Sequence, residues 1–113
     1  MKREAAVSRA LVGADRIWLG YVELGPGLVS AAHHHGEAES AIYIISGQAR
    51  FLTDGATQDA NAGDVVWVPP HIVHVELNRS ATEPVHMVVA RSTQETLVFN
   101  VEMPQSFRER LPR

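Results

Sequence analysis

The sequence predicts an all-β fold, a sandwich or barrel of about eight short strands. Three observations point to this class. The runs of β-branched, aromatic and apolar residues are short, turn-forming residues separate them, and the turns recur about every 8–12 residues. A jelly-roll β-barrel is one arrangement that protects the exposed edges of such strands. With 113 residues, the chain is long enough for a single domain, residues 1–113, and too short for two.

The expected elements follow from the turn signals, of which Gly25-Pro26-Gly27, Asp54-Gly55 and Pro69-Pro70 are the strongest. Residues 4–12 are rich in alanine and are expected to be helical. The polar tail, residues 104–113, is expected to be exposed or loosely docked. The predicted strands cover residues 17–24, 28–35, 41–45, 48–53, 65–68, 71–77, 85–90 and 96–101.

Composition excludes several classes of function. The chain has no cysteine, which rules out disulfides, thiolate ligands and cysteine nucleophiles. Its net charge of −3 comes without a basic stripe, so no nucleic-acid partner is expected. It contains no run of about 18 apolar residues, so no membrane span is expected. The start of the chain lacks the apolar segment of a secretory signal, and we therefore expect a cytoplasmic location.

Histidine dominates what remains, because three of the six histidines are consecutive. Residues two apart on a strand share a face, so His33 and His35 point together while His34 points away. Two imidazoles on one face form half of a site for a first-row metal. The alternative is that three polar residues simply end a strand before Gly36. His74, on another predicted strand, supplies a third imidazole and favours the metal site.

The residues around these histidines resemble the two sequence motifs of the cupin superfamily. The resemblance implies a small, single-domain cupin with a jelly-roll β-barrel, and often a homodimer. It also implies a divalent ion (iron, manganese, nickel, zinc or copper) bound by His33, His35, Glu39 and His74. The first motif, at 27–47, is carried by Gly27, His33, His35, Glu39 and Gly47, and the second, at 63–78, by Gly63, Pro69, His74 and Asn78.

Two departures from the family pattern bear on the ligand set. Seven residues separate Glu39 from Gly47, where the pattern has six, so Ser40 stands at the glutamate position by that count. Strict alternation gives Ser40 and Glu39 opposite faces, and Glu39 reaches the metal only if a bulge shifts the register. We favour Glu39 as a ligand over a site of three histidines alone. The second departure is His71, which occupies a glycine position where a positive φ would be awkward.

Two further charged residues, Glu76 and Arg50, are candidates for a role at the site. Glu76 shares a face with His74, and it is either an outward charge or a catalytic carboxylate that orients a ligand or accepts a substrate proton. Arg50 is a second candidate, as an anchor for an anionic substrate.

A histidine site with open coordination positions predicts a metal-dependent enzyme, a dioxygenase or isomerase acting on a small oxygenated molecule. The alternatives are a non-catalytic cupin that binds or senses a small molecule, and a purely structural metal. The expected partners are a small-molecule ligand or substrate and a second copy of the chain in a homodimer, with no nucleic acid and no membrane.

Overall fold

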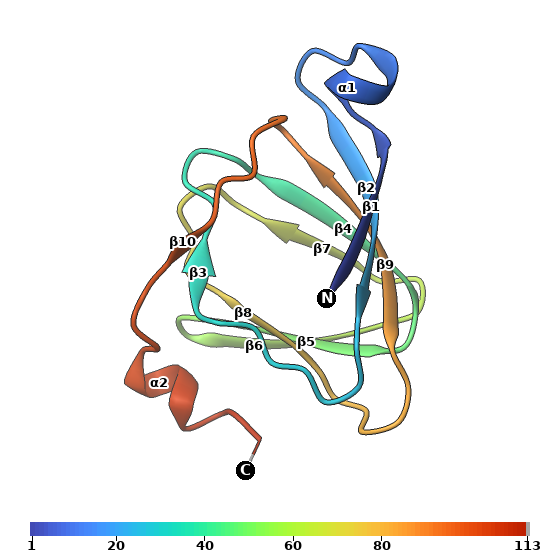
Figure 1. Cartoon of the computed structure of the whole chain (residues 1–113). Coiled ribbons are helices and arrows are strands. Elements are labelled where there is room, and N and C mark those ends of the chain that lie inside the picture. Colours follow the sequence, from blue (N-terminus) through green and yellow to red (C-terminus); the bar gives the residue numbers. More distant parts are fainter. Residues whose placement is uncertain (113) are drawn as a thin grey trace.

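The computed structural model describes residues 1–112 and is built mainly of antiparallel strands (Figure 1). The two helices in this part of the chain have four residues each, α1 Arg9–Val12 and α2 Gln105–Arg108. The strands are β1 Lys2–Val7, β2 Trp18–Leu24, β3 His33–His34, β4 Ser40–Ser46, β5 Gln48–Thr53, β6 Ala56–Asn61, β7 Val65–Val68, β8 Val75–Asn78, β9 Val85–Arg91 and β10 Phe99–Asn100.

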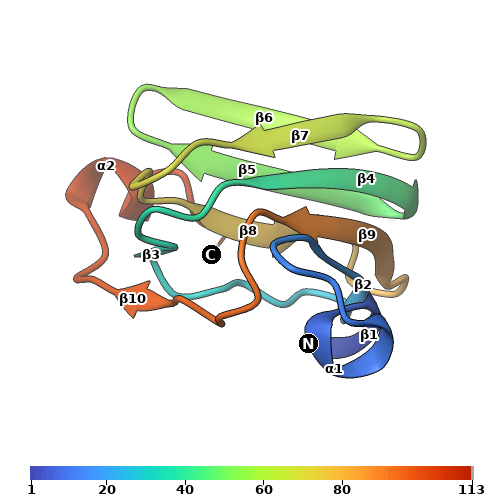
Figure 2. The same cartoon turned by 90° about the horizontal axis from the view of Figure 1, so that it is seen from above.

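The strands form two walls around a common interior. One wall is a five-stranded sheet in the order β1-β2-β9-β4-β7, and the other joins the sheets β6-β5-β8 and β10-β3. Isolated bridges between Val29 and Leu77 and between His33 and His74 connect these two smaller sheets. The sheets do not close into one continuous ladder, but the strands enclose the interior on all sides (Figures 1 and 2). The predicted all-β jelly-roll fold is confirmed.

Alternation along the strands divides the apolar residues between two clusters. Inward-facing side chains of the large sheet, such as Ile42, Ile44 and Met87, pack on Phe51 of β5 in the interior. The second cluster lies on the outer side of β5 and β8, where Phe107 of α2 packs against Leu52 and its neighbours. Because burying apolar area is the main driving force for folding, these clusters fix the two walls and the tail in place.

The N-terminal segment differs from the prediction. Residues 4–12 were expected to be helical, but residues 2–7 form β1, which pairs with β2 along the edge of the large sheet. Only Arg9–Val12 is helical, with Ser8 accepting a hydrogen bond from the Leu11 N–H as N-cap and Gly13 ending the helix at a φ of 76°. The ladder with β2 outweighs the helix propensity of alanine, which is a weak local preference.

One strand, β6, was not predicted at all. Its sequence, ATQDAN, is polar and mostly exposed, so it carries no apolar alternation that would mark it as a strand. The full ladder with β5, from Gln48 opposite Asn61 to Thr53 opposite Ala56, holds it in place. The predicted strands at 28–35, 71–77 and 96–101 are also shorter in the structure, because only part of each segment pairs with a neighbouring strand.

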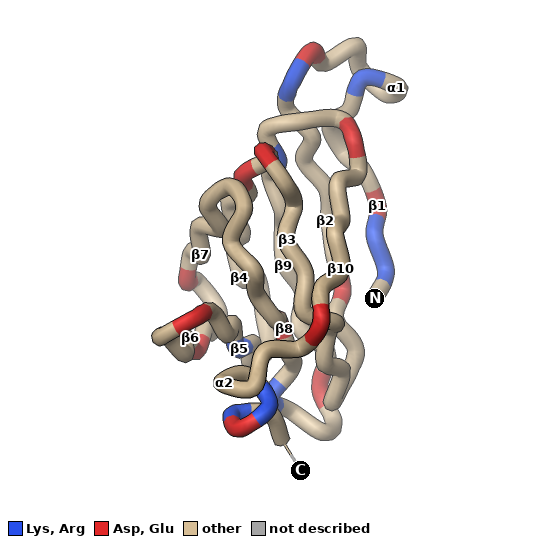
Figure 3. The backbone as a smooth tube through the Cα atoms, turned by 90° about the vertical axis from the view of Figure 1, so that its left-hand side faces the viewer, with Lys and Arg blue, Asp and Glu red and all other residues tan. Residues whose placement is uncertain are grey.

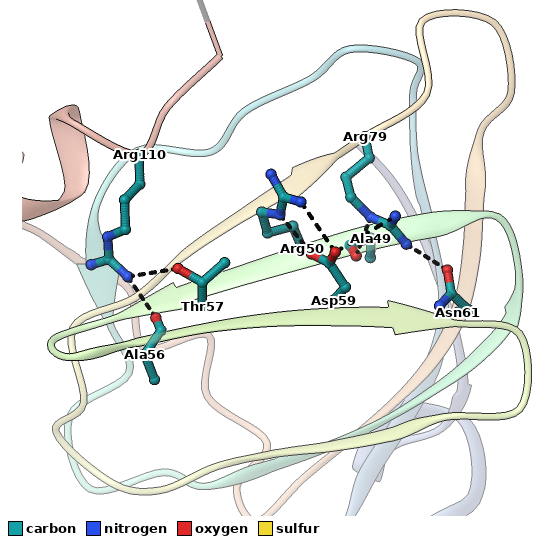
Figure 4. Close-up of polar contacts among 8 residues, drawn as sticks. All are labelled: Ala49, Arg50, Ala56, Thr57, Asp59, Asn61, Arg79 and Arg110. Carbon is teal, nitrogen blue, oxygen red and sulfur yellow. Dashed lines mark hydrogen bonds and ion pairs between the residues drawn. The ribbon is translucent and has the colours of Figure 1, made fainter.

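The C-terminal tail, predicted to be exposed or loosely docked, is largely exposed but is anchored by two side chains. Phe107 is 1 % exposed. Arg110 donates hydrogen bonds to the carbonyl oxygen of Ala56 and to the hydroxyl of Thr57 (Figure 4), and also to the carbonyl oxygen of Thr53. These contacts tie the tail to the turn between β5 and β6. No helix within residues 1–112 has the length and apolar character needed to cross a lipid bilayer. The expected cytoplasmic location stays a prediction.

Candidate metal centre

Three histidines from two segments meet at one end of the interior. His33 and His74 lie opposite each other and exchange two backbone hydrogen bonds, with N···O distances of 3.1 and 2.9 Å. His35 follows two residues after His33 and returns its ring to the same side. One nitrogen from each of His33, His35 and His74 lies within 4.8 Å of the others. The structure therefore brings together the three imidazoles that the sequence placed in one site.

Backbone carbonyls fix the tautomer of all three rings. The Nδ1 atoms of His33, His35 and His74 lie 2.7, 2.7 and 3.0 Å from the carbonyl oxygens of Ala31, Leu97 and Ile72. A carbonyl oxygen can only accept, so each Nδ1 carries the proton and donates it. Each Nε2 then presents a free lone pair. A backbone carbonyl that accepts the Nδ1 proton is a common way to orient a metal-binding imidazole.

Burial keeps two of the rings neutral. Desolvation lowers the pKa of His74 to about 4, because charging the ring inside the protein costs more than charging it in water. Desolvation also lowers the pKa of His35, against the opposing effect of its hydrogen bond to Leu97. Both imidazoles are therefore available as neutral ligands at pH 7, without a proton to displace.

The structure does not place Glu39 in this group, which corrects the expected ligand set. Glu39 is exposed, and its Oε2 accepts a hydrogen bond of 3.0 Å from the Trp67 indole on the outer face of the sheet. Ser40 is buried and faces the interior, as strict alternation required. A register shift does occur in β4, but between Ile44 and Ser46. The bulge takes up the additional residue after Glu39, so it cannot turn Glu39 inward.

Two positions were expected for Glu76, an outward charge or a carboxylate at the site. The structure turns its side chain inward, to the site. Its Oε1 lies 3.9 Å from the Nε2 of His33, and both side chains are largely buried. It lines the same cavity as His35 and His74, with Ser40 on the opposite wall. The carboxylate next to the imidazoles is thus Glu76, from the second motif, and not Glu39.

The cavity that these groups share is small, and most of its wall is apolar. The space open to a water-sized molecule is about 50 Å³. Ile42, Val68 and Met87 are among its apolar lining residues, while Arg3 and Arg91 also reach it. Arg91 was not predicted as a site residue, although the inward row of Val85, Met87 and Val89 on β9 leads directly to it. Continuing that alternation by one step would have found it.

Other motif residues support the site from outside. His71 adopts a φ of 63°, so the turn keeps the positive φ of the family's glycine position, and its N–H donates to the Gly36 carbonyl at 2.7 Å. This hydrogen bond holds the segment after His35 beside the segment before His74. Asn78 is buried and donates to the carbonyls of Leu24, Gly25 and Glu83.

Arg50 is not near the cavity. It lies on the outer side of β5, where its Nε donates to Asp59 at 2.6 Å and lowers the pKa of that carboxyl (Figure 4). Its guanidinium already has a carboxylate partner, so the structure removes it as an anchor for a substrate.

Comparison with known proteins agrees with the geometry. The family model of the cupin domain matches residues 20–91, well over half of the chain. The chain belongs to the cupin family. No curated protein matches this cupin by sequence.

Several solved structures are similar to this cupin in fold. A cupin 2 domain-containing protein from Halorhodospira halophila has a TM-score of 0.78 at 20 % identity, covering 97 % of this chain and 74 % of that one. The polyketide cyclase RemF from Streptomyces resistomycificus has a TM-score of 0.76 at 23 % identity, with coverages of 91 % and 72 %. A recombinant oxalate oxidase in complex with glycolate has a TM-score of 0.74 at 17 % identity, with coverages of 96 % and 63 %. At these identities the likenesses show the fold alone.

Proposed function

We propose that this cupin is a metal-dependent enzyme, a dioxygenase or an isomerase, that acts on a small oxygenated molecule. The observation that carries the proposal is the convergence of three Nε2 lone pairs from His33, His35 and His74 beside a cavity that His35, His74 and the Glu76 carboxylate line. Two of the solved structures with the same fold are enzymes by name, a polyketide cyclase and an oxalate oxidase. Those names support an enzymatic role without specifying a reaction.

The donor set fits a divalent metal ion. Each ring donates its Nδ1 proton to a carbonyl, so the groups that face each other at the site are acceptors only. Acceptors that converge without a shared proton repel one another, and a cation between them removes that repulsion. Imidazole nitrogen suits iron, nickel, copper and zinc, and a carboxylate extends the range to manganese.

The protein side of the chemistry follows from the positions of the side chains. His33, His35 and His74 would hold the ion, which when bound supplies Lewis acidity or a site for oxygen chemistry. The Glu76 carboxylate lies where it can accept a proton from a substrate hydroxyl or from a carbon next to a carbonyl. The Ser40 hydroxyl, buried on the same cavity, can hydrogen-bond to a substrate oxygen. The apolar walls exclude bulk water and strengthen these polar interactions.

The direct test combines turnover with metal retention. The protein is loaded separately with Fe²⁺, Mn²⁺, Ni²⁺, Cu²⁺ and Zn²⁺ and assayed for oxygen uptake and for isomerisation with small diketones, hydroxy-ketones and hydroxy acids, which are of a size that the cavity admits. We expect turnover with at least one ion, and its loss by about 100-fold or more in the Glu76→Gln variant with metal still bound. Arg50→Gln, which changes a charge outside the cavity, serves as the control.

The opposite results define the alternative function. Metal binding and tight ligand binding without turnover for any ion would make this cupin a binding or sensing module. An ion whose coordination is completed by protein atoms alone, with no exchangeable water, would make the metal structural. Either result would contradict the enzymatic proposal while leaving the metal centre intact.

We also propose that this cupin forms a homodimer through the outer face of the large sheet. Neighbouring side chains of β4 and β7 there remain exposed: Tyr43 by 48 %, Ile45 by 44 %, Val65 by 68 % and Trp67 by 63 %. An exposed apolar face of this kind can pack against its own copy about a two-fold axis. Light scattering should give twice the chain mass, and Val65→Lys should halve it. A monomeric wild-type protein at micromolar concentration would contradict this proposal.

A further inference from the structure

Two arginines line the cavity of the imidazole triad, and the proposed function uses neither. Arg91 is the last residue of β9 and continues its inward row. Arg3 belongs to β1, pairs with Val22 across the ladder and reaches the same cavity. The basic start of β1 is the blue stretch beside the N label in Figure 3. The sheet thus directs two positive charges to one opening.

The guanidinium of Arg91 is held in a defined position. Its Cζ lies 4.0 Å from the centroid of the Trp18 ring, a cation–π arrangement. Trp18 in turn lies over Gly20, where a Cβ atom would collide with the indole. Gly20 therefore leaves the space for the indole, and the indole supports one face of the guanidinium. Stacking uses the face of the group and leaves its N–H edge for hydrogen bonds.

Neither arginine has a carboxylate partner in the part of the chain that the structure describes. Within residues 1–112, no carboxylate forms an ion pair with Arg91 or Arg3, and the buried Nε of Arg91 has no hydrogen-bond partner. By contrast, Arg50 and Arg79 on the outer face share Asp59. Burial lowers the pKa of Arg91, and the charge of Arg3 lowers it further. Holding two unpaired cations together is unfavourable, and an anion between them would relieve this cost.

We infer that Arg91 and Arg3 form a subsite for the carboxylate group of a small organic acid that enters this cavity. A guanidinium presents two parallel N–H groups that match the two oxygens of a carboxylate. A cavity of about 50 Å³ limits the acid to a few heavy atoms beyond the carboxylate. The inference rests on the proposed function, because it assigns the substrate class of that same cavity.

The experiment measures binding rather than turnover. Lactate, pyruvate and succinate are each titrated by calorimetry against the Zn²⁺-loaded protein, and each is compared with its neutral amide, which has nearly the same shape. We expect at least one acid to bind about tenfold or more tightly than its amide. Arg91→Gln should remove that preference, and Arg91→Lys should keep only part of it, because lysine retains the charge without the planar fork. Arg3→Gln should weaken the binding of the acid by less than Arg91→Gln does, since Arg3 is more exposed.

Controls separate this inference from the proposed function. Arg50→Gln should bind the acid as the wild type does, because its charge is already paired outside the cavity. Zn²⁺ content is measured for every variant, and thermal melting checks that each is folded. If the acid depends on Arg91 but the protein holds no metal, the proposed function fails and the subsite stands. If metal binds but no acid is preferred over its amide, or the preference survives Arg91→Gln, the subsite is wrong.

Discussion

Protonation of His74 should destabilise the metal-free protein in a defined pH range. The pKa of His74 is lowered from 6.5 to about 4 by burial. The unfolded chain therefore binds more protons at this residue than the folded chain does between these two values. By linkage, the free energy of unfolding rises with pH across this range, so stability is lost as the pH falls from about 6.5 toward 4.

The size of the effect follows from the shift. A shift of one pKa unit corresponds to about 1.4 kcal/mol, so the contribution of His74 between pH 7 and pH 4 is about 3 kcal/mol. Other groups titrate in the same range, and the quantity to measure is therefore a difference between two proteins. His74→Asn serves for this, since the asparagine amide keeps a donor for the Ile72 carbonyl and does not titrate.

The assay is urea denaturation in the presence of a chelator, from pH 7 to pH 4, for wild type, His74→Asn and His71→Asn. We expect the wild type to lose about 3 kcal/mol more than His74→Asn over this range. His71→Asn is the matched control, because His71 is exposed and asparagine tolerates its positive φ; it should keep the wild-type slope. Equal slopes for wild type and His74→Asn would refute the reasoning that burial sets the protonation state of this site.

Four further substitutions test the packing of the fold by denaturation. Gly47→Ala should destabilise the protein by about 3 kcal/mol or more, because its Cβ would lie 2.5 Å from the Pro84 carbonyl oxygen at a φ of 97°. Gly63→Ala, where a Cβ meets open space and only the φ of 92° is unfavourable, should cost about 1 kcal/mol; equal costs would contradict the clash. Asn78→Ala should cost about 2–3 kcal/mol, since three carbonyls lose their donor. Phe107→Ala should cost about 3–5 kcal/mol, and a cost below about 1 kcal/mol would mean that the tail is not docked as the structure shows.

The sequence predicts the three histidines because their signal is local. His33 and His35 share a face by alternation, and His74 falls at a fixed place in the second motif. Neither of these two inferences requires knowledge of how the strands pack. The prediction of Glu39 as a metal ligand was wrong for a physical reason. The additional residue before Gly47 is accommodated by a bulge after Ile44, and a count of residues cannot locate a bulge.

The elements that escaped prediction are those set by tertiary contacts. Strand β6 is polar and exists because β5 offers it a complete ladder. Strand β1 replaces the expected helix because an edge of the sheet is available to pair with it. The tail is held by Phe107 and Arg110. Their partners lie mainly on β5, β6 and β8, so the composition of the tail itself does not reveal them.

The most direct test of the account is the metal content of the purified protein after loading with Zn²⁺ and desalting. We predict one ion per chain for wild type and for two controls, His34→Asn, whose ring stacks on Phe99 outside the cluster, and Glu39→Gln. We predict loss of most of the ion in each of the variants His33→Asn, His35→Asn and His74→Asn. A full equivalent of zinc in any two of these three would contradict a shared metal centre.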